Sequence, residues 1–133
     1  KVSIFMNVFN CHVNRMPASG KVKQIYYKPG KFFNASLDKA SSENERNYIK
    51  IKNSNDEELV LVQIAGLVAR RIVCDIKEEN EIKQGERFGI IRFGSRVDLY
   101  FEKYKLLAKV NQKTIAGETL IATKWIKITK NLN

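Results

Sequence analysis

The segment from Phe88 to Phe101, FGIIRFGSRVDLYF, constrains the fold of this chain more than any other. Aromatic and β-branched residues fill it, and these residues favour a pleated, half-buried strand. We therefore predict one long strand from Arg87 to Phe101. Gly94 and Ser95 interrupt this strand, and an internal glycine usually marks a bulge, a bend or a close backbone approach. On these residues alone, a β-bulge on an edge strand is the simpler interpretation, and chemistry by Ser95 on its own peptide bond is the alternative.

The rest of the chain also consists of short strand-like runs separated by turn-forming residues. The clearest pair is Arg46–Asn53 and Glu58–Ala65, which the turn formers between Asn53 and Asp56 join as a hairpin. The most apolar run, Val60–Ala69, predicts a buried strand that continues past Gly66.

Few segments depart from this strand-and-turn pattern. Lys28-Pro-Gly-Lys31 has the proline and glycine positions of a type II turn. Residues 32–44 predict either one short helix or an ordered loop. We therefore predict a mainly β, single-domain fold over residues 1–133, like a β-barrel or sandwich, with one or two short helices.

Composition limits the partners of such a domain. A net charge of +10 over 133 residues indicates an anionic partner, namely nucleic acid, an acidic membrane or a negatively charged substrate, unless the surface is merely basic. No nucleic-acid-binding motif is present, so we expect no nucleic-acid partner. Cys11 and Cys74 stand far apart, which predicts buried free thiols in a reducing compartment and no metal site.

His12 is the only histidine, and it lies in a polar patch before Pro17. A single histidine is more often structural, but this setting raises the case for a functional role. It stands 83 residues before Ser95, so spacing alone cannot reveal a pair between them.

Arginines accompany each of the unusual motifs. They suit bidentate binding of a carboxylate or phosphate, with paired surface arginines on strands as the alternative. The set comprises Arg15, Arg46, Arg70, Arg71, Arg92 and Arg96.

Six ordered motifs then carry a resemblance. They are HVNRMP (12–17), PGKFFNA (29–35), DKAS (38–41), NER (44–46), VQIAGLVARRIVC (62–74) and GERFGIIRFGSRVD (85–98). Together they resemble the short form of phosphatidylserine decarboxylase, continuously from about Val2 to Ala122. The resemblance implies a self-processing, pyruvoyl-dependent carboxy-lyase of phospholipid biosynthesis that converts phosphatidylserine to phosphatidylethanolamine.

The resemblance also implies where the chain is processed. Cleavage falls between Gly94 and Ser95, when the serine hydroxyl attacks the preceding carbonyl and forms an ester. Elimination releases a β chain of residues 1–94, and hydrolysis leaves a pyruvoyl group at the start of an α chain of residues 95–133. A glycine before the serine agrees with this chemistry, because it tolerates strained geometry.

Further expectations follow from the same resemblance. His12 matches a family histidine and is expected to transfer protons during maturation or catalysis. Arg15, Arg46, Arg92 and Arg96 are the expected substrate-binding residues, and an αβ homo-oligomer is expected. We expect peripheral attachment to the cytoplasmic face of a bacterial-type inner membrane, with any anchor in a segment that precedes Lys1.

Two features depart from the family pattern. Longer family members carry a second histidine where this chain has Arg15, and the family's Asp-Gly motif would precede Lys1. The alternative hypothesis is therefore a non-enzymatic basic β module, such as an inactive or truncated precursor, that binds anionic membrane surfaces.

Overall fold

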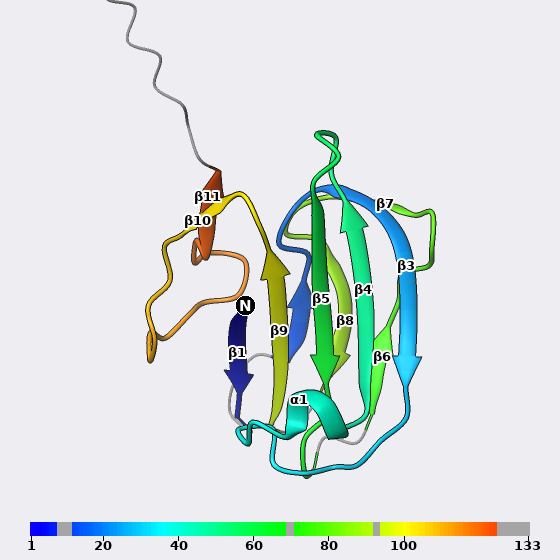
Figure 1. The fold of residues 1–133 in the computed structure, drawn as a ribbon, viewed down its shortest axis with the longest axis vertical. Coiled ribbons are helices and arrows are strands. Elements are labelled where there is room, and N and C mark those ends of the chain that lie inside the picture. The colour runs from blue at the N-terminus through cyan, green and yellow to red at the C-terminus, as the bar shows by residue number, and fades with distance from the viewer. Residues whose placement is uncertain (8–11, 69–70, 92–93, 125–133) are drawn as a thin grey trace, which may run out of the picture.

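The computed structural model describes residues 1–7, 12–68, 71–91 and 94–124. This part of the chain is mainly β, as predicted, with one short helix (Figure 1). Its elements are β1 (Val2–Met6), β2 (Val13–Arg15), β3 (Gly20–Lys28), α1 (Ala40–Glu43), β4 (Arg46–Lys52), β5 (Glu58–Ile64), β6 (Ile72–Cys74), β7 (Glu81–Ile82), β8 (Arg87–Ile91), β9 (Ser95–Phe101), β10 (Tyr104–Leu106) and β11 (Ala122–Lys124).

Two antiparallel sheets face each other in a sandwich. The larger sheet has the strand order β1-β9-β5-β4-β3-β7, and the smaller has the order β2-β8-β6 and lies behind it in Figure 1. Strands β10 and β11 form a separate ribbon beside β9. The sheets are curled, so the arrangement lies within the predicted barrel- or sandwich-like class.

The core lies between the two sheets because apolar residues alternate along the central strands. Ile49 and Ile51 of β4 and Leu59 and Leu61 of β5 are buried, and they pack in one cluster with Phe88 of β8. Full burial of each such side chain stabilises the fold by about 1.5–3 kcal/mol. These contacts hold the two sheets together and fix which face of each strand points inward.

The predicted hairpin is confirmed as the pair β4 and β5. The two strands pair in continuous register along their whole length. The side-chain carbonyl oxygen of Asn53 accepts hydrogen bonds from the backbone N–H groups of Asn55 and Glu57, each at 2.9 Å. These bonds close the turn, as expected for an asparagine that mimics a backbone turn.

The prediction of one strand from Arg87 to Phe101 is wrong. Strand β8 ends at Ile91 in the smaller sheet, and β9 begins at Ser95 in the larger one. Gly94 has a φ of +70° just before β9, so it lies at the entrance to a strand and not in a bulge within one. Both halves have strand-forming residues, and periodicity does not reveal that the chain changes sheets.

Two further expectations are corrected at the lower end of the molecule in Figure 1. Strand β5 ends at Ile64 and does not continue past Gly66, which instead lies against the Gly94 carbonyl. Gly30 does not have the positive φ that a type II turn requires. It instead allows close approach to the backbone of residues 43–45, where a Cβ would collide.

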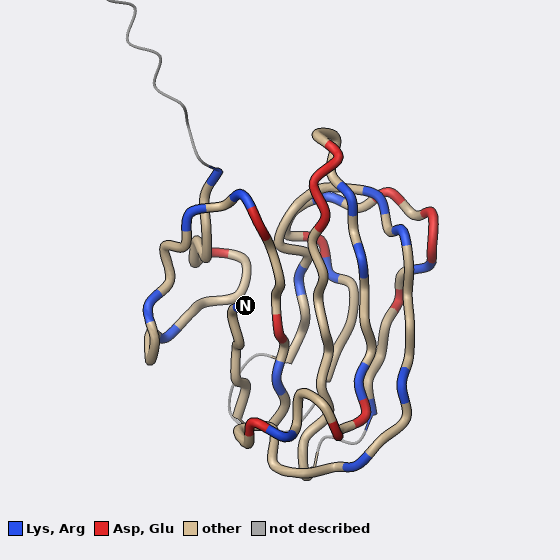
Figure 2. The backbone as a smooth tube through the Cα atoms, viewed as in Figure 1, with Lys and Arg blue, Asp and Glu red and all other residues tan. Residues whose placement is uncertain are grey.

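Residues 32–44 combine the two predicted alternatives, since only the four residues of α1 are helical and the rest is an ordered loop. This loop and α1 lie across the lower ends of β5 and β9 (Figure 1). Among the described residues, lysines and arginines are spread over both sheets and the ribbon and are not confined to one element (Figure 2). Net charge therefore does not locate a site.

Candidate active site

Ser95 is the first residue of β9, and its side chain points into the sandwich. It is only 1 % exposed, and its hydroxyl donates a hydrogen bond of 3.1 Å to the backbone carbonyl of Ile91. It pairs in register with Met6 of β1, and Met6, Ile91 and Val97 form a small apolar cluster there. The hydroxyl is thus ordered and shielded from bulk water immediately after the left-handed Gly94.

His12 lies just before β2 of the opposite sheet and is connected to the Ser95 site through Ile91. Its backbone carbonyl accepts a hydrogen bond from the Ile91 N–H at 3.2 Å, one residue before β2 begins. Ile91 therefore contacts both residues, with its N–H on His12 and its carbonyl on the Ser95 hydroxyl. The fold thus connects the backbone of His12 and the hydroxyl of Ser95 to the same residue, although the two lie far apart in the sequence.

A buried chain of amides extends from this point through the sandwich. Asn14 accepts a hydrogen bond from the Gln63 side-chain amide at 2.9 Å, and Gln63 accepts one from Asn47 at 3.0 Å. The Asn14 amide also donates to the Met6 sulfur at 3.9 Å. All three amides are 6 % exposed or less. The sequence signal of this network is a polar residue within an apolar strand, above all Gln63, which was not among the predicted site residues.

Cys74 is a half-buried free thiol at the far end of this chain of amides. Burial is the main cause that raises its pKa, so it remains protonated and weakly nucleophilic at neutral pH. Cys11 lies outside the described residues.

Arg96 does not present its guanidinium to solvent. It forms a two-point ion pair with Asp98, with Nε–Oδ1 at 2.7 Å and Nη2–Oδ2 at 2.8 Å. Both side chains are nearly fully buried, and Nη1 reaches the backbone carbonyls of Ala35 at 3.4 Å and Leu37 at 3.5 Å. The hydrogen bond to Asp98 raises the pKa of Arg96. Substrate binding by this arginine would therefore require the buried pair to open.

Arg46 is similarly engaged within the protein. It is 5 % exposed, and it donates to the Tyr48 hydroxyl at 2.6 Å and the Asn44 carbonyl at 2.9 Å. It also lines an open hollow of about 340 Å³ on the outer face of the larger sheet, together with Gln24, Tyr26, Lys28, Tyr48, Lys50 and Val60. Ser95 points to the other face of that sheet, so this hollow is not part of the Ser95 site.

Arg15 and Arg92 complete the predicted set of substrate-binding residues. Arg15 lies on β2 and donates from Nη1 to the Gly85 carbonyl at 2.9 Å, so it supports the turn before β8. Arg92, like Arg70, lies outside the described residues. Among the described arginines, the structure therefore does not gather Arg15 with Arg46 and Arg96 around one anion site.

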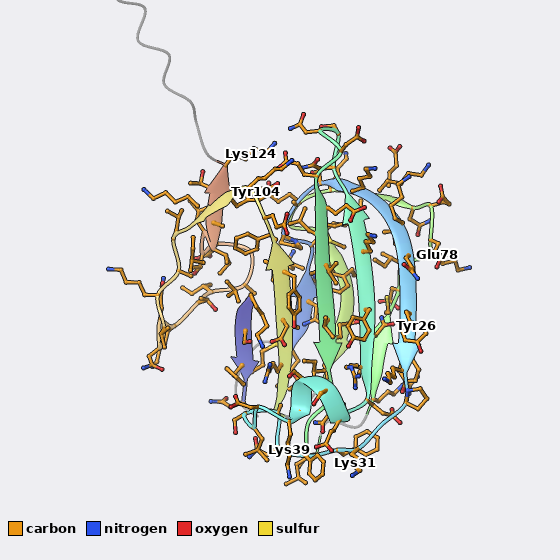
Figure 3. The ribbon with its side chains drawn as sticks, in the orientation of Figure 1. Tyr26, Lys31, Lys39, Glu78, Tyr104 and Lys124 are labelled. Atoms are coloured by element: carbon orange, nitrogen blue, oxygen red, sulfur yellow. The ribbon has the colours of Figure 1, made fainter. Side chains whose placement is uncertain are left out.

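Asn44 belongs to the NER motif (44–46) but was not among the predicted site residues. Its side chain is fully buried, and its amide donates to the carbonyls of Phe33 and Ala65, each at 2.8 Å. Its oxygen accepts from the Phe33 N–H at 2.9 Å. The Nζ of Lys39 lies 3.9 Å and that of Lys31 5.4 Å from the Phe33 ring centre, at the lower end of the molecule (Figure 3). Asn44 thus ties the loop before α1 to the end of β5.

Comparison with known proteins identifies the family of the chain. The phosphatidylserine decarboxylase family profile matches residues 1–122. The chain belongs to this family. No solved structure gives a significant match.

Individual relatives support the assignment. The chain is 67% identical over 124 residues to a phosphatidylserine decarboxylase proenzyme of Pelagibacter ubique, covering 93% of this chain and 58% of the relative. It is 60% identical over 123 residues to that of Rickettsia typhi, covering 92% and 53%. With the Rickettsia bellii proenzyme it shares 57% identity over 133 residues, covering 99% and 58%. The chain thus spans little more than half the length of these relatives.

One structural observation concerns membrane-spanning segments. Among the residues that the structure describes, no helix has both the length and the apolar character needed to cross a bilayer.

Proposed function

We propose that this chain carries the self-cleavage site and catalytic serine of a phosphatidylserine decarboxylase, which converts phosphatidylserine to phosphatidylethanolamine. One observation carries the proposal. In a chain of this family, a left-handed Gly94 immediately precedes a buried Ser95 whose hydroxyl is held by a backbone carbonyl. Family membership favours this enzyme over a non-enzymatic basic module.

Self-cleavage uses only groups of the chain and one water molecule. The Ser95 Oγ loses its proton and bonds to the Gly94 carbonyl carbon, and the peptide C–N bond breaks to leave an ester and a free Ser95 amine. Elimination then removes the Ser95 Cα proton and breaks the Cβ–Oγ bond, which forms a Cα–Cβ double bond and releases the Gly94 carboxylate. Water hydrolyses the resulting enamine to ammonia and a pyruvoyl group at position 95.

The surroundings of Ser95 fit such a group. The side chain is enclosed by Met6, Ile91 and Val97, and this apolar setting limits access of bulk water to a reactive carbonyl. The pyruvoyl group would supply an electron sink for the electron pair that departing CO2 leaves behind. The apolar cluster would also favour loss of the charged carboxylate.

His12 is the residue that we assign to proton transfer, because it shares Ile91 with the Ser95 hydroxyl. We expect His12→Ala to slow self-cleavage by about 100-fold or more, which is the scale of general acid–base catalysis. The measurement is the fraction of cleaved precursor against time by gel densitometry. Cleavage of His12→Ala at the wild-type rate would remove this residue from maturation.

Substrate approaches the site as a lipid, and two exposed apolar residues stand next to it. Leu67 is 57% and Val68 66% exposed, and they follow directly on Gly66, beside the Gly94 carbonyl. We propose that they contact the acyl chains of phosphatidylserine in the bilayer. The overall charge of +10 would add attraction to anionic lipid, about 1 kcal/mol per well-placed Lys or Arg.

This role gives a prediction for the mature enzyme. Changing Leu67 and Val68 together to serine is expected to raise the KM for phosphatidylserine vesicles roughly tenfold, because two apolar contacts are weakened. The KM for a soluble short-chain phosphatidylserine should change far less. The matched control is Val110→Ser, which changes an exposed apolar residue in the segment between β10 and β11. Equal changes in KM for both substrates would contradict lipid contact.

Decarboxylation itself is tested on the full-length gene product. Purified protein should release CO2 from carboxyl-labelled phosphatidylserine, and pretreatment with a hydrazine should abolish this by blocking the pyruvoyl carbonyl. Vesicle binding that falls steeply with salt, with no release of CO2, would favour the basic module instead. Homo-oligomerisation of αβ units and attachment to the cytoplasmic face remain predictions of the family resemblance.

A further inference from the structure

A second glycine lies against the carbonyl that Ser95 would attack. A Cβ added to Gly66 would overlap the Gly94 carbonyl oxygen and come within 3.0 Å of its carbon. Real Cβ atoms essentially never approach a heavy atom more closely than 3.0 Å. Gly66 does not need glycine for its own φ, which lies outside the left-handed region. Position 66 therefore requires glycine because no side chain fits there, and not because of its backbone conformation.

Gly66 is held in this place from the side of β5. The carbonyl of the preceding Ala65 accepts the buried Asn44 amide at 2.8 Å, and the Ala65 N–H bonds to the Glu45 carbonyl at 3.0 Å. The segment next to the Gly94 carbonyl is thus fixed through both polar groups of its neighbour. Such a segment cannot move aside cheaply, because buried groups would lose their partners.

The same point is supported from the loop before α1. Ala35 is buried, and its Cβ lies 3.6 Å from the position of a Gly66 Cβ. Its carbonyl accepts from Arg96, the residue that follows Ser95. Three segments that are distant in sequence therefore meet around one peptide carbonyl.

We propose that Gly66 is a positioning residue for self-cleavage, which seats the Gly94 carbonyl so that the Ser95 hydroxyl can attack it. This inference rests on the proposed self-cleavage. A side chain at position 66 would displace the carbonyl oxygen, which must also move further as the carbon becomes tetrahedral during attack. A misplacement of about 1 Å commonly costs about 100-fold in rate.

The test compares Gly66→Ala with the wild-type precursor by intact mass over time, with and without hydroxylamine. Hydroxylamine cleaves the ester that forms on attack, giving a Gly94 hydroxamate and a free Ser95 amine. We expect Gly66→Ala to cleave about 100-fold more slowly under both conditions, because the attack itself is impaired. Rapid cleavage of Gly66→Ala by hydroxylamine would place its defect after the attack and overturn the proposal, as would a wild-type rate without the reagent.

A matched variant separates positioning from general damage to the fold. Gly20→Ala also introduces a Cβ against a backbone oxygen, 2.7 Å from the Lys52 carbonyl, at the opposite end of the molecule. Both changes are also made in an uncleavable Ser95→Ala precursor, where thermal unfolding reports their cost in stability. Gly20→Ala should lower the melting temperature and still cleave normally. Equal slowing by the two variants at equal stability would contradict a specific role for Gly66.

If Gly66→Ala does not accumulate as folded protein, Asn44→Ala replaces it, because it releases Ala65 without adding volume beside the carbonyl. Its control is Asn53→Ala, which removes two side-chain-to-backbone hydrogen bonds at the distant hairpin turn. Slower cleavage in Asn44→Ala but not in Asn53→Ala supports the positioning of the Gly94 carbonyl by Gly66. Equal cleavage rates in the two variants overturn it. Failure of the wild type to cleave would instead refute the proposed function, so the two failures are distinguishable.

Discussion

Replacement of Ser95 by alanine is expected to leave the precursor as one uncleaved chain without decarboxylase activity. The Oγ that would form the ester is then absent, and the neighbouring groups offer no substitute within the apolar cluster of Met6, Ile91 and Val97. The expected effect is complete loss of cleavage, measured by denaturing electrophoresis after prolonged incubation. The fold should persist, because the change removes one hydroxyl and one hydrogen bond.

Ser36 provides a matched control for this experiment. It lies in the nearby loop before α1, where its hydroxyl bonds to the Asn34 side chain at 2.8 Å and remains exposed. Ser36→Ala should cleave like the wild type. Cleavage of Ser95→Ala at the same bond would show that another group breaks the chain.

Loss of the Asp98 carboxylate is expected to cause the largest change in stability. Arg96 would remain buried without its two-point partner, at a cost of about 3–5 kcal/mol in the free energy of unfolding. The comparison is made between Asp98→Ala and wild type, both in the Ser95→Ala background, by urea denaturation. The uncleaved background keeps both proteins as single chains.

Two controls define the origin of this loss. The exposed pair between Lys50 and Glu58, at 3.2 Å, should matter far less, so Glu58→Ala should cost about 1 kcal/mol or less. Replacing Arg96 and Asp98 together by methionine and leucine should recover much of the loss, since no unpaired buried charge remains. A cost below about 1 kcal/mol for Asp98→Ala would contradict a structural ion pair.

Local features of the sequence predicted the hairpin and the fold class. The hairpin of β4 and β5 follows from alternating residues around an asparagine-rich turn, which are interactions between near neighbours. The change of sheet between β8 and β9 could not be predicted in this way, because both segments have equally good strand residues. Only pairing with distant strands decides which sheet each segment joins.

The candidate site was predictable as a Gly-Ser step but not as an arrangement in space. Ser95 and His12 meet through Ile91, a contact that depends on the pairing of β2 with β8. Arginine patterns suggested anion binding, yet Arg46 and Arg96 are buried among backbone carbonyls and neighbouring side chains. The sequence does not distinguish an anion-binding arginine from one that is bonded within the protein, because burial depends on distant contacts such as those of Arg96 with the loop before α1.

The mass of the chain that begins at position 95 tests the central claim most directly. Full-length protein is purified under mild conditions, denatured and measured intact. We expect two chains separated between Gly94 and Ser95, with the second lighter by one ammonia than a peptide with a free N-terminal serine. A single chain that contains an unmodified Gly94–Ser95 bond, in protein that nevertheless releases CO2 from phosphatidylserine, would contradict it.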